Sequence, residues 1–599
     1  MSKYPIETTR HTLSHVMAYA IQQIYPDVKF GFGPVVENGF YYDFDFSSGN
    51  YKLTEKDFIE IEKKMQKIID DKLPVEHLYI SAEEAIKDAK ASGQKYKSEL
   101  LEEIQKGDRM AITEADVEKQ KSGELSFYKI GAFVDLCKGP HVENTKDLPK
   151  DSFKIDHVAG AYWRGDEHNP MLTRIYAVAF STKEELDNYL IMIEEAEKRD
   201  HRKFGKQLDL YSFSEFVGSG LPLYTPRGAL VRRLLNDYVE EMQLKANYMQ
   251  VWTPQIAKAE LFKISGHYDK YKDSMFRVVS NYSDEEFFLK PMNCPQHTQI
   301  YASQMRSYRD LPLRYTDFAM LYRDEKPGEL SGLARVRSFS QDDCHIFCRE
   351  DQVDEEIDVA LQMTKEIMET FGFKYKYRLS TRDKNHPEKY LGDPNTWDKV
   401  EKWAEKIMKR NKIEYFDGPG EAAFYAPKMD LIATDALGRD WQLSTVQIDY
   451  VMPERFGLTY IDKDGKEKHP IMLHRAIIGS SERFMMILLE HYAGALPVWL
   501  SPVQATILPI SENHKKFGKD VFEKLAEVGV RVELGDANET LGKRIREAEI
   551  QKIPYLLVIG DKEIDKKAVA VRQRGVGDIG QMDIEKLIGQ ITEEIKNKK

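Results

Sequence analysis

The middle of the chain holds the stretch Tyr322-Arg323-Asp324-Glu325, followed through a glycine-rich turn by Arg335-Val336-Arg337-Ser338-Phe339. Arginines at strand ends are suited to bidentate contacts with phosphate. The ring of Phe339 could offer its face to a flat base. Surface arginines without a ligand would explain the same spacing equally well. Taken alone, this stretch leaves a nucleotide site and a plain surface equally open.

A second stretch, Gly479-Ser480-Ser481-Glu482-Arg483-Phe484, opens an apolar helix that runs through Leu489. Ser480 or Ser481 is expected to cap this helix. Arg483 falls in its first turn, where the helix dipole favours an anion. An arginine at this place is electrostatically unfavourable unless it faces a phosphate or a carboxylate.

A third stretch, the amphipathic segment 247–254, precedes both and ends in Thr253-Pro254. Taken in their order along the chain, 247–254, 322–339 and 479–484, the three stretches resemble the signature motifs of class II aminoacyl-tRNA synthetases. Three further segments narrow the resemblance to the threonyl-tRNA synthetase family: Pro291-Met292-Asn293-Cys294-Pro295, Gln341-Asp342-Asp343-Cys344-His345 and Leu473-His474-Arg475-Ala476. The resemblance extends over nearly the whole chain.

The resemblance implies an α+β multidomain protein. Residues 1–180 would form an editing domain, 181–204 a linker helix, 205–500 a catalytic domain with an antiparallel sheet flanked by helices, and 501–599 an α/β anticodon-binding domain. The hydrophobic pattern independently predicts helices at 54–72 and 183–203. Beyond Ser501-Pro502 it predicts strands at 505–510, 531–534, 555–560 and 568–572, with helices at 515–527, 541–551 and 584–595.

The activity implied by the resemblance is threonine–tRNA ligation, in which ATP with Mg²⁺ activates L-threonine for transfer to tRNA(Thr). Carried over by position, Arg323 would hold the α-phosphate and Arg483 the γ-phosphate. Glu325 would contact the adenine or its metal, and Phe339 would stack on the ring. His267 and Lys428 are further catalytic candidates, with His267 matching a histidine of the transfer step. The remaining ATP-binding candidates are Arg335 and Gln442, and the threonine-binding candidates are Met292, Gln341, Asp343, Tyr425, Gln447 and Ser480.

A zinc ion held by Cys294, His345 and His474 is also implied by the resemblance. These residues lie far apart in sequence and match no short zinc pattern. Three protein ligands leave a position open for substrate. Threonine could ligate the metal through its amino and hydroxyl groups, and a site built for a hydroxyl rejects valine by about 10⁴ or more. Serine loses only one methyl, worth about 1–3 kcal/mol, so a second sieve is expected.

The N-terminal segment holds a separate group of histidines. His11 and His15 lie at i and i+4 on one helix face, and Cys137 and His141 follow Asp135. A zincin protease would need glutamate after the first histidine, where Thr12 stands. A structural Cys-His₃ zinc site stays open. The resemblance implies instead an editing site that hydrolyses seryl-tRNA(Thr), with Tyr42, Lys97, Asp135 and the four metal-type residues as its members.

Four polar residues of the last domain match family positions at or near anticodon contacts. They are Asn538, Arg546, Glu563 and Arg572. Unstacked bases are read on their edges by such side chains. Without the resemblance, surface charges of an α/β domain would be the simpler interpretation.

Two departures from the family pattern stand out. Gln296 replaces the glycine usual before His297, which would cost about 1–2 kcal/mol if that position needs a positive φ. The ubiquitin-like domain that usually precedes the editing domain is expected to be missing, because His11 comes almost at the start.

Composition limits the alternatives. The 599 residues are 42% hydrophobic and 31% charged, with a net charge of −12, which excludes a disordered chain and a simple basic nucleic-acid coat. No run approaches the roughly 20 apolar residues of a membrane span, and four cysteines suggest a reducing, cytoplasmic compartment. Cys344 and Cys348 are expected to be plain buried residues. A homodimer is implied by the class II resemblance. A non-catalytic tRNA-binding paralogue and a serine or proline synthetase are the rival functions.

Overall fold

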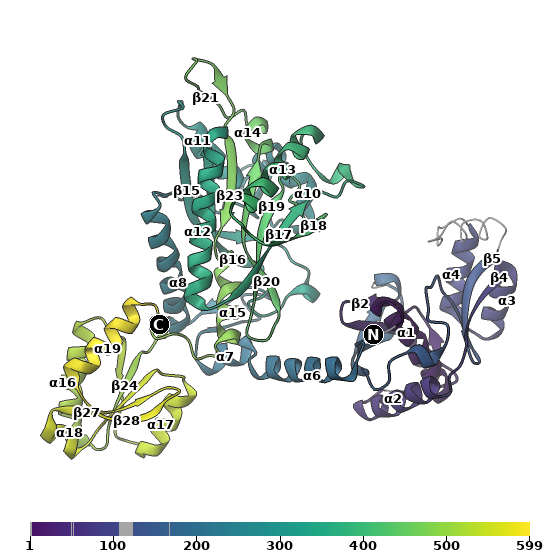
Figure 1. Ribbon diagram of the computed structural model, residues 1–599, viewed down its shortest axis with the longest axis horizontal. Coiled ribbons are helices and arrows are strands. Elements are labelled where there is room, and N and C mark those ends of the chain that lie inside the picture. The colour runs from purple at the N-terminus through teal and green to yellow at the C-terminus, as the bar shows by residue number, and fades with distance from the viewer. Residues whose placement is uncertain (1–2, 50, 52, 107–123, 167) are drawn as a thin grey trace. The chain divides into compact units, whose positions relative to one another are not determined.

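The computed structural model describes residues 3–49, 51, 53–106, 124–166 and 168–599. Within it the chain divides into two compact units, Met1–Glu194 and Glu195–Lys599. Figure 1 traces the order of their elements. Each unit is built around sheets whose neighbouring strands are mainly antiparallel. The α+β multidomain class predicted from the sequence is confirmed.

The first unit packs helices α1 (Ile6–Ile24) and α2 (Glu55–Asp70) against a five-stranded sheet. Thr54 precedes α2 as its N-cap, so the predicted helix is confirmed. The sheet contains β1 (Lys29–Phe30), β2 (Val35–Val36), β3 (Gly39–Asp45), β7 (Phe153–Tyr162) and β8 (Met171–Ala179). A smaller sheet contains β4 (Val75–Ser81), β5 (Glu124–Ile130) and β6 (Phe133–Leu136), with α3 (Ala82–Ala91) and α4 (Lys95–Lys106) beside it.

The single helix predicted over 183–203 is wrong. The structure has two helices there, α6 (Lys183–Lys198) and α7 (His201–Gln207). The Asp200 carboxylate accepts a hydrogen bond from the backbone N–H of Arg202 and so caps a new helix. An N-cap residue has a non-helical backbone, which is why the first helix cannot continue through Asp200.

An eight-stranded sheet organises the larger unit (Figure 1). All its neighbouring strands are antiparallel except the two edge pairs, β11 with β15 and β17 with β18. Helices α8 (Pro226–Lys245), α12 (Val353–Phe371) and α15 (Ser481–His491) contribute to one core with this sheet. The strands, in spatial order, are β11 (Met249–Gln250), β15 (Leu313–Tyr322), β16 (Ser338–Cys348), β23 (Ile471–Ala476), β20 (Asp440–Asp449), β19 (Lys428–Thr434), β17 (Lys374–Thr381) and β18 (Tyr415–Pro419).

The last hundred residues form a five-stranded sheet in the order β25-β24-β26-β27-β28. The predicted strands appear as β24 (Ala505–Pro509), β25 (Val532–Leu534), β26 (Tyr555–Ile559) and β27 (Ala568–Gln573). The predicted helices appear as α16 (Lys515–Glu527), α17 (Leu541–Ile550) and α19 (Ile584–Lys596). Two elements were missed, α18 (Asp561–Lys566) and β28 (Gly577–Asp583). The glycines at 577 and 580 weaken the strand pattern of β28 and make the segment resemble a turn.

The strain considered for Gln296 does not arise. Gln296 lies inside α11 (Cys294–Ala302), and its amide donates a 3.0 Å hydrogen bond to the carbonyl of Pro254. All four cysteines lie in the described part of the chain and are buried free thiols, as expected for Cys344 and Cys348. None of the helices described here is long and apolar enough to cross a membrane.

Candidate active site

A cavity of about 400 Å³ opens where β15 ends, β16 begins and α15 starts. Arg323 follows the last residue of β15, and Arg483 stands in the first turn of α15. All six residues predicted to bind ATP line the cavity: Arg323, Glu325, Arg335, Phe339, Gln442 and Arg483. Gln341 and Ser480 of the predicted threonine set line it too.

The arginines of this cavity repel one another. Burial lowers the pKa of Arg323. Burial, reinforced by the charges of Arg323 and Arg335, lowers the pKa of Arg483. The main counter-charge is Glu325, whose carboxylate accepts a 2.8 Å ion-pair contact from Arg335. Burial and mutual repulsion both disfavour these positive charges, so an anionic ligand such as a polyphosphate would stabilise them.

The start of α15 is fixed by Ser480 rather than Ser481. The hydroxyl of Ser480 accepts a 3.2 Å hydrogen bond from the N–H of Arg483. Gly479 has a φ of +66°, and a Cβ there would lie 2.8 Å from the carbonyl oxygen of Leu443. Only glycine fits this bend, which brings the helix N-terminus and Arg483 to the cavity.

Strand β16 carries substrate-type side chains at alternate positions. Phe339 and Gln341 line the cavity, whereas Asp343 and His345 follow at the same two-residue spacing. In between, Asp342 accepts a 2.6 Å hydrogen bond from the N–H of Ile477, and Cys344 joins the main core. Because side chains alternate along a strand, one face of β16 runs from the arginine cavity to the histidine cluster described next.

Cys294, His345 and His474 form a fully buried cluster whose donor atoms all lie within 4.8 Å of one another. His474 Nε2 is 2.8 Å from an Asp449 carboxylate oxygen, and His345 Nδ1 is 2.8 Å from His297 Nδ1. Each ligand-type histidine therefore has its second nitrogen engaged, the arrangement seen in most zinc sites. A Cys-His-His donor set of this kind fits zinc with one position open.

The other predicted threonine and transfer residues surround this cluster. The ring centroid of Tyr425 lies 4.8 Å from that of His474, and His267 Nε2 lies 3.0 Å from Met292 Sδ. Gln447 pairs with His474 across the sheet. Its Oε1 is buried and has no hydrogen-bond partner among the described residues. Burial raises the pKa of Asp343 to about 6. Lys428 lies 3.4 Å from Asp430, next to Gln442, whose amide donates to the other Asp430 oxygen.

Two supporting residues were missed by the sequence analysis, Asp449 and His297. Asp449 stands at the end of β20, 25 positions before His474, and no spacing rule connects them. His297 is closer to being visible, because it lies one helical turn after Cys294 in α11. Its other ring nitrogen lies 2.8 Å from the Asn293 amide. The repeated presence of histidine near cysteine was the only available signal.

The seven predicted editing residues gather in the first unit. Cys137 Sγ lies 3.2 Å from His11 Nε2 and 3.1 Å from His141 Nε2. His15 packs edge-on against His141, at 4.6 Å between ring centroids. Burial keeps the pKa of His15 and of His141 well below the usual range, so both rings are neutral near pH 7.

A buried polar triad adjoins these imidazoles. Lys97 Nζ lies 2.5 Å from an Asp135 oxygen, and the Tyr42 hydroxyl donates to the other oxygen at 2.5 Å. His15 Nδ1 is 3.8 Å from Asp135 and has no hydrogen-bond partner among the described residues. A buried nitrogen without a hydrogen-bond partner indicates that a ligand or a water molecule binds here.

The predicted anticodon residues divide into two environments. Arg572 on β27 lies 3.5 Å from Glu549 of α17, the helix that also carries the exposed Arg546, and Asn538 is exposed just before that helix. Glu563 is buried instead. It accepts hydrogen bonds from the N–H of Gly560 and the amide of Gln581. Its contacts are those of a helix cap.

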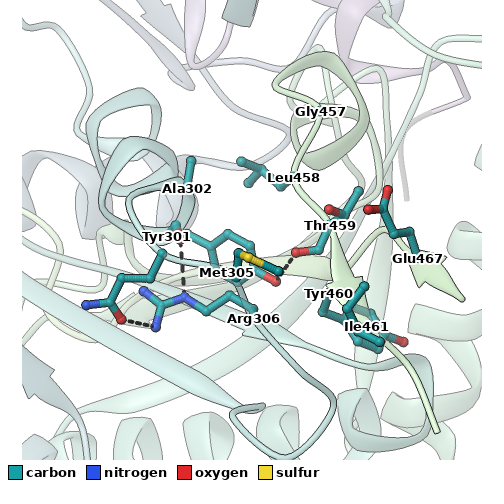
Figure 2. Close-up of a pocket in the computed structure, with 11 residues that line it drawn as sticks. Tyr301, Ala302, Met305, Arg306, Gly457, Leu458, Thr459, Tyr460, Ile461 and Glu467 are labelled. Atoms are coloured by element: carbon teal, nitrogen blue, oxygen red, sulfur yellow. Dashed lines mark hydrogen bonds between the residues drawn. The ribbon is translucent and has the colours of Figure 1, made fainter. Parts of the chain in front are cut away.

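A second cavity, of about 220 Å³, lies between the end of α11 and the hairpin of β21 (Tyr460–Ile461) and β22 (Glu467–Lys468) (Figure 2). The Tyr301 hydroxyl donates to the Thr459 carbonyl, and Arg306 donates to the Tyr301 carbonyl. None of the predicted site residues, all of which are described, lines this cavity. It is separate from the arginine cavity.

Comparison with known domains assigns the class. Residues 276–492 match the tRNA synthetase class II core domain (G, H, P, S and T), and residues 504–594 match an anticodon binding domain. Residues 125–176 match the threonyl and alanyl tRNA synthetase second additional domain. With the antiparallel sheet and the arginine cavity, these matches define a class II aminoacyl-tRNA synthetase.

Relatives along the whole chain narrow the class. The threonine–tRNA ligases of Halalkalibacterium halodurans and Thermotoga maritima are each 44% identical over 99% of this chain and 89% of the relative. The RNA binding domain of threonyl-tRNA synthetase from Cryptosporidium parvum superposes with a TM-score of 0.63 at 37% identity, covering 66% of this chain and 98% of that one. The chain belongs to the threonyl-tRNA synthetase family, the ligases that join threonine to tRNA, which confirms the resemblance drawn from the motifs.

Proposed function

We propose that the arginine cavity and the Cys294–His345–His474 cluster form one site, which activates L-threonine with Mg²⁺-ATP and transfers it to tRNA(Thr). One observation carries this assignment. A single face of β16 presents Phe339 and Gln341 to the cavity, and Asp343 and His345 toward the cluster. A nucleotide and an amino acid bound along this face would have their reacting groups side by side, the positioning that activation requires.

At the nucleotide end, Phe339 would stack on adenine, with Glu325 and Gln442 contacting its edge or the metal. Arg323 would bind the α-phosphate, where negative charge grows as the carboxylate of threonine attacks. Arg483 would hold the γ-phosphate, with Arg335 beside it. The mutual repulsion of Arg323 and Arg483 supports these roles, because bound phosphates would relieve it.

At the amino-acid end, zinc bound by Cys294, His345 and His474 would serve as a Lewis acid that takes up the amino and hydroxyl groups of threonine. The buried carboxylate of Asp343 and the unpartnered Oε1 of Gln447 would accept hydrogen bonds from the ammonium side. Tyr425, Met292, Gln341 and Ser480 would enclose the rest of the substrate. Valine would leave the hydroxyl position unfilled, which is the basis of its rejection.

In the transfer step, His267 would accept the proton of the tRNA ribose hydroxyl. Its Nε2 lies at Met292, on the threonine side of the site, and its Nδ1 contacts the Ser265 hydroxyl at 2.8 Å. Proton transfer by a positioned imidazole is worth about 10²–10⁴ in rate. Lys428 would add positive charge beside the adenylate.

ATP–pyrophosphate exchange across all twenty amino acids tests the assignment directly. We expect threonine to support the fastest exchange, serine a slower one, and valine none above background. No exchange with any amino acid would favour a non-catalytic tRNA-binding protein. Exchange dominated by serine or proline would identify one of the rival synthetases.

For the first unit we propose hydrolysis of mischarged seryl-tRNA(Thr). The match to the second additional domain is consistent with editing. The neutral imidazoles beside Lys97, Tyr42 and Asp135 could position or deprotonate a water for attack on the ester. We likewise propose that the editing domain ends at residue 180, the linker at 204 and the catalytic domain at 500.

We also propose a cytoplasmic homodimer formed through the 247–254 segment, the first of the three class II motifs along the chain. Exposed apolar side chains flank β11, with Leu244 57%, Met249 43% and Trp252 76% accessible. Such a patch is typical of a subunit interface. A sedimentation experiment that finds a monomer at micromolar concentration would contradict the homodimer.

For the last domain, Arg572→Ala should lower aminoacylation about tenfold while exchange stays within twofold of the wild type. Loss of a contact to an unstacked base costs about 1–3 kcal/mol, and activation of threonine needs no tRNA. The Nε of Arg572 is buried without a hydrogen-bond partner among the described residues, so the guanidinium has capacity for a ligand. Initial rates of both reactions provide the measurement. Equal losses in both would indicate damage to folding instead.

A further inference from the structure

A buried histidine outside the active site connects the linker segment to the ATP cavity. His201 is the first residue of α7 and is 5% exposed. Its Nδ1 lies 2.6 Å from a carboxylate oxygen of Glu490, near the end of α15. Its Nε2 accepts a 3.1 Å hydrogen bond from the N–H of Leu333. One ring thus touches both the helix that carries Arg483 and the turn that precedes Arg335.

The hydrogen bonds fix the state of the ring. Because Leu333 N–H can only donate, Nε2 is an acceptor and the proton sits on Nδ1, where it is donated to Glu490. The other Glu490 oxygen accepts from Arg439. Both ring nitrogens are therefore used in hydrogen bonds within the protein.

The turn rests directly on this ring. Gly332 has a φ of +47°, and a Cβ there would lie 2.1 Å from His201 Nε2. From the other side, Arg483 Nε donates a 3.1 Å hydrogen bond to the carbonyl of Ala334. Residues 331–335 are thus held between His201 and Arg483. The last two of them, Ala334 and Arg335, line the ATP cavity.

We propose that His201 is a positioning residue for ATP. It supports the 331–335 turn through Leu333, so that Ala334 and Arg335 stand at the distance that the nucleotide requires, while its bond to Glu490 fixes the ring against α15. It touches no substrate itself. The proposal rests on the assignment of the cavity to ATP. A wild type without exchange would refute that assignment, whereas the comparison of variants below addresses His201 alone.

Two amide substitutions separate the two hydrogen bonds. The amide of His201→Asn reaches about as far as Nδ1 and can donate to Glu490, but leaves Leu333 N–H without an acceptor. The amide of His201→Gln reaches about as far as Nε2 and can accept from Leu333. We expect the KM for ATP in threonine-dependent exchange to rise about tenfold in His201→Asn, because a buried donor is left unsatisfied.

In His201→Gln the KM for ATP should rise less than about threefold, since the acceptor for Leu333 N–H is kept. The KM for threonine should stay within twofold in both variants. A purely structural role predicts a different pattern, in which both variants lose thermal stability and raise both KM values together. That result, or an unchanged KM for ATP in a folded His201→Asn, would overturn the proposal.

If His201→Asn does not fold, Gly332→Ala provides the same test from the side of the turn. The added methyl would press on His201 Nε2 and displace the turn while the His201–Glu490 bond is kept. A raised KM for ATP with an unchanged KM for threonine supports the proposal. Unchanged values for both substrates refute it.

Discussion

Replacing Cys294 with serine should release the proposed zinc ion and lower threonine-dependent exchange by more than about 100-fold. Substitution of an outer-shell partner alone typically costs 10–100-fold, and Cys294 is one of the three donors that the described residues supply to the cluster. The remaining histidines, His345 and His474, cannot hold the ion at cellular concentrations. Metal content of the purified protein and the rate of exchange are measured on the same sample, and His474→Ala should give the same result.

Cys348→Ser is the matched control. Cys348 lies on β16, three residues after His345, but it packs in the main core and is not part of the cluster. The same change of sulfur to oxygen should cost stability there while zinc content and exchange are kept. Unchanged exchange in a Cys294→Ser protein shown to be free of zinc would refute the zinc assignment.

Removing His11 should separate editing from synthesis. In His11→Ala the hydrolysis of pre-formed seryl-tRNA(Thr) should fall by about 100-fold or more, the usual contribution of a positioned acid or base. Seryl-tRNA should then accumulate during aminoacylation with serine, while threonyl-tRNA forms at nearly the normal rate. The two sites belong to different compact units, so the effects should be independent. Cys137→Ala should behave similarly.

His168→Ala is the control for this experiment, because its side chain is 85% exposed in the same unit. The alternative of a structural Cys-His₃ zinc site predicts a different result. Two zinc ions would be found per wild-type chain, and His11→Ala would lose one of them together with the thermal stability of the first unit. Equally slow hydrolysis by the wild type and His11→Ala would mean that this domain does not edit.

Local patterns predicted secondary structure well where a single rule governs a segment. The hydrophobic pattern over 54–72 was enough to predict α2. The break at Asp200 was not foreseen, because an aspartate can lie within a helix or cap a new one, and the local sequence does not decide between the two. Strand β28 was missed since its glycines obscure the alternation.

The active site shows a sharper limit of prediction. Phe339 and Arg323 could be proposed from their local chemistry, whereas the cluster of Cys294, His345 and His474 came only from the family resemblance. Its members come from one helix and two strands, and register between β16 and β23 brings His345 opposite His474. Such pairing is a tertiary fact that no spacing in one segment encodes. Asp449, which contacts His474 from the neighbouring strand, could not be predicted for the same reason.

In the proposed site, strand β16 sets the distance between the nucleotide and the amino acid. From Phe339 to His345 the chain advances six residues, or roughly 20 Å at about 3.3 Å per residue. The rise of the strand per residue thus determines the distance between the proposed adenine and threonine positions. Inserting one residue would exchange the two faces of the strand beyond the insertion, so the side chains that face the proposed site there would point into the core instead. Exchanging the side chain at 343, which is not one of the proposed zinc ligands, would instead change the choice of amino acid and leave the proposed nucleotide end as it is.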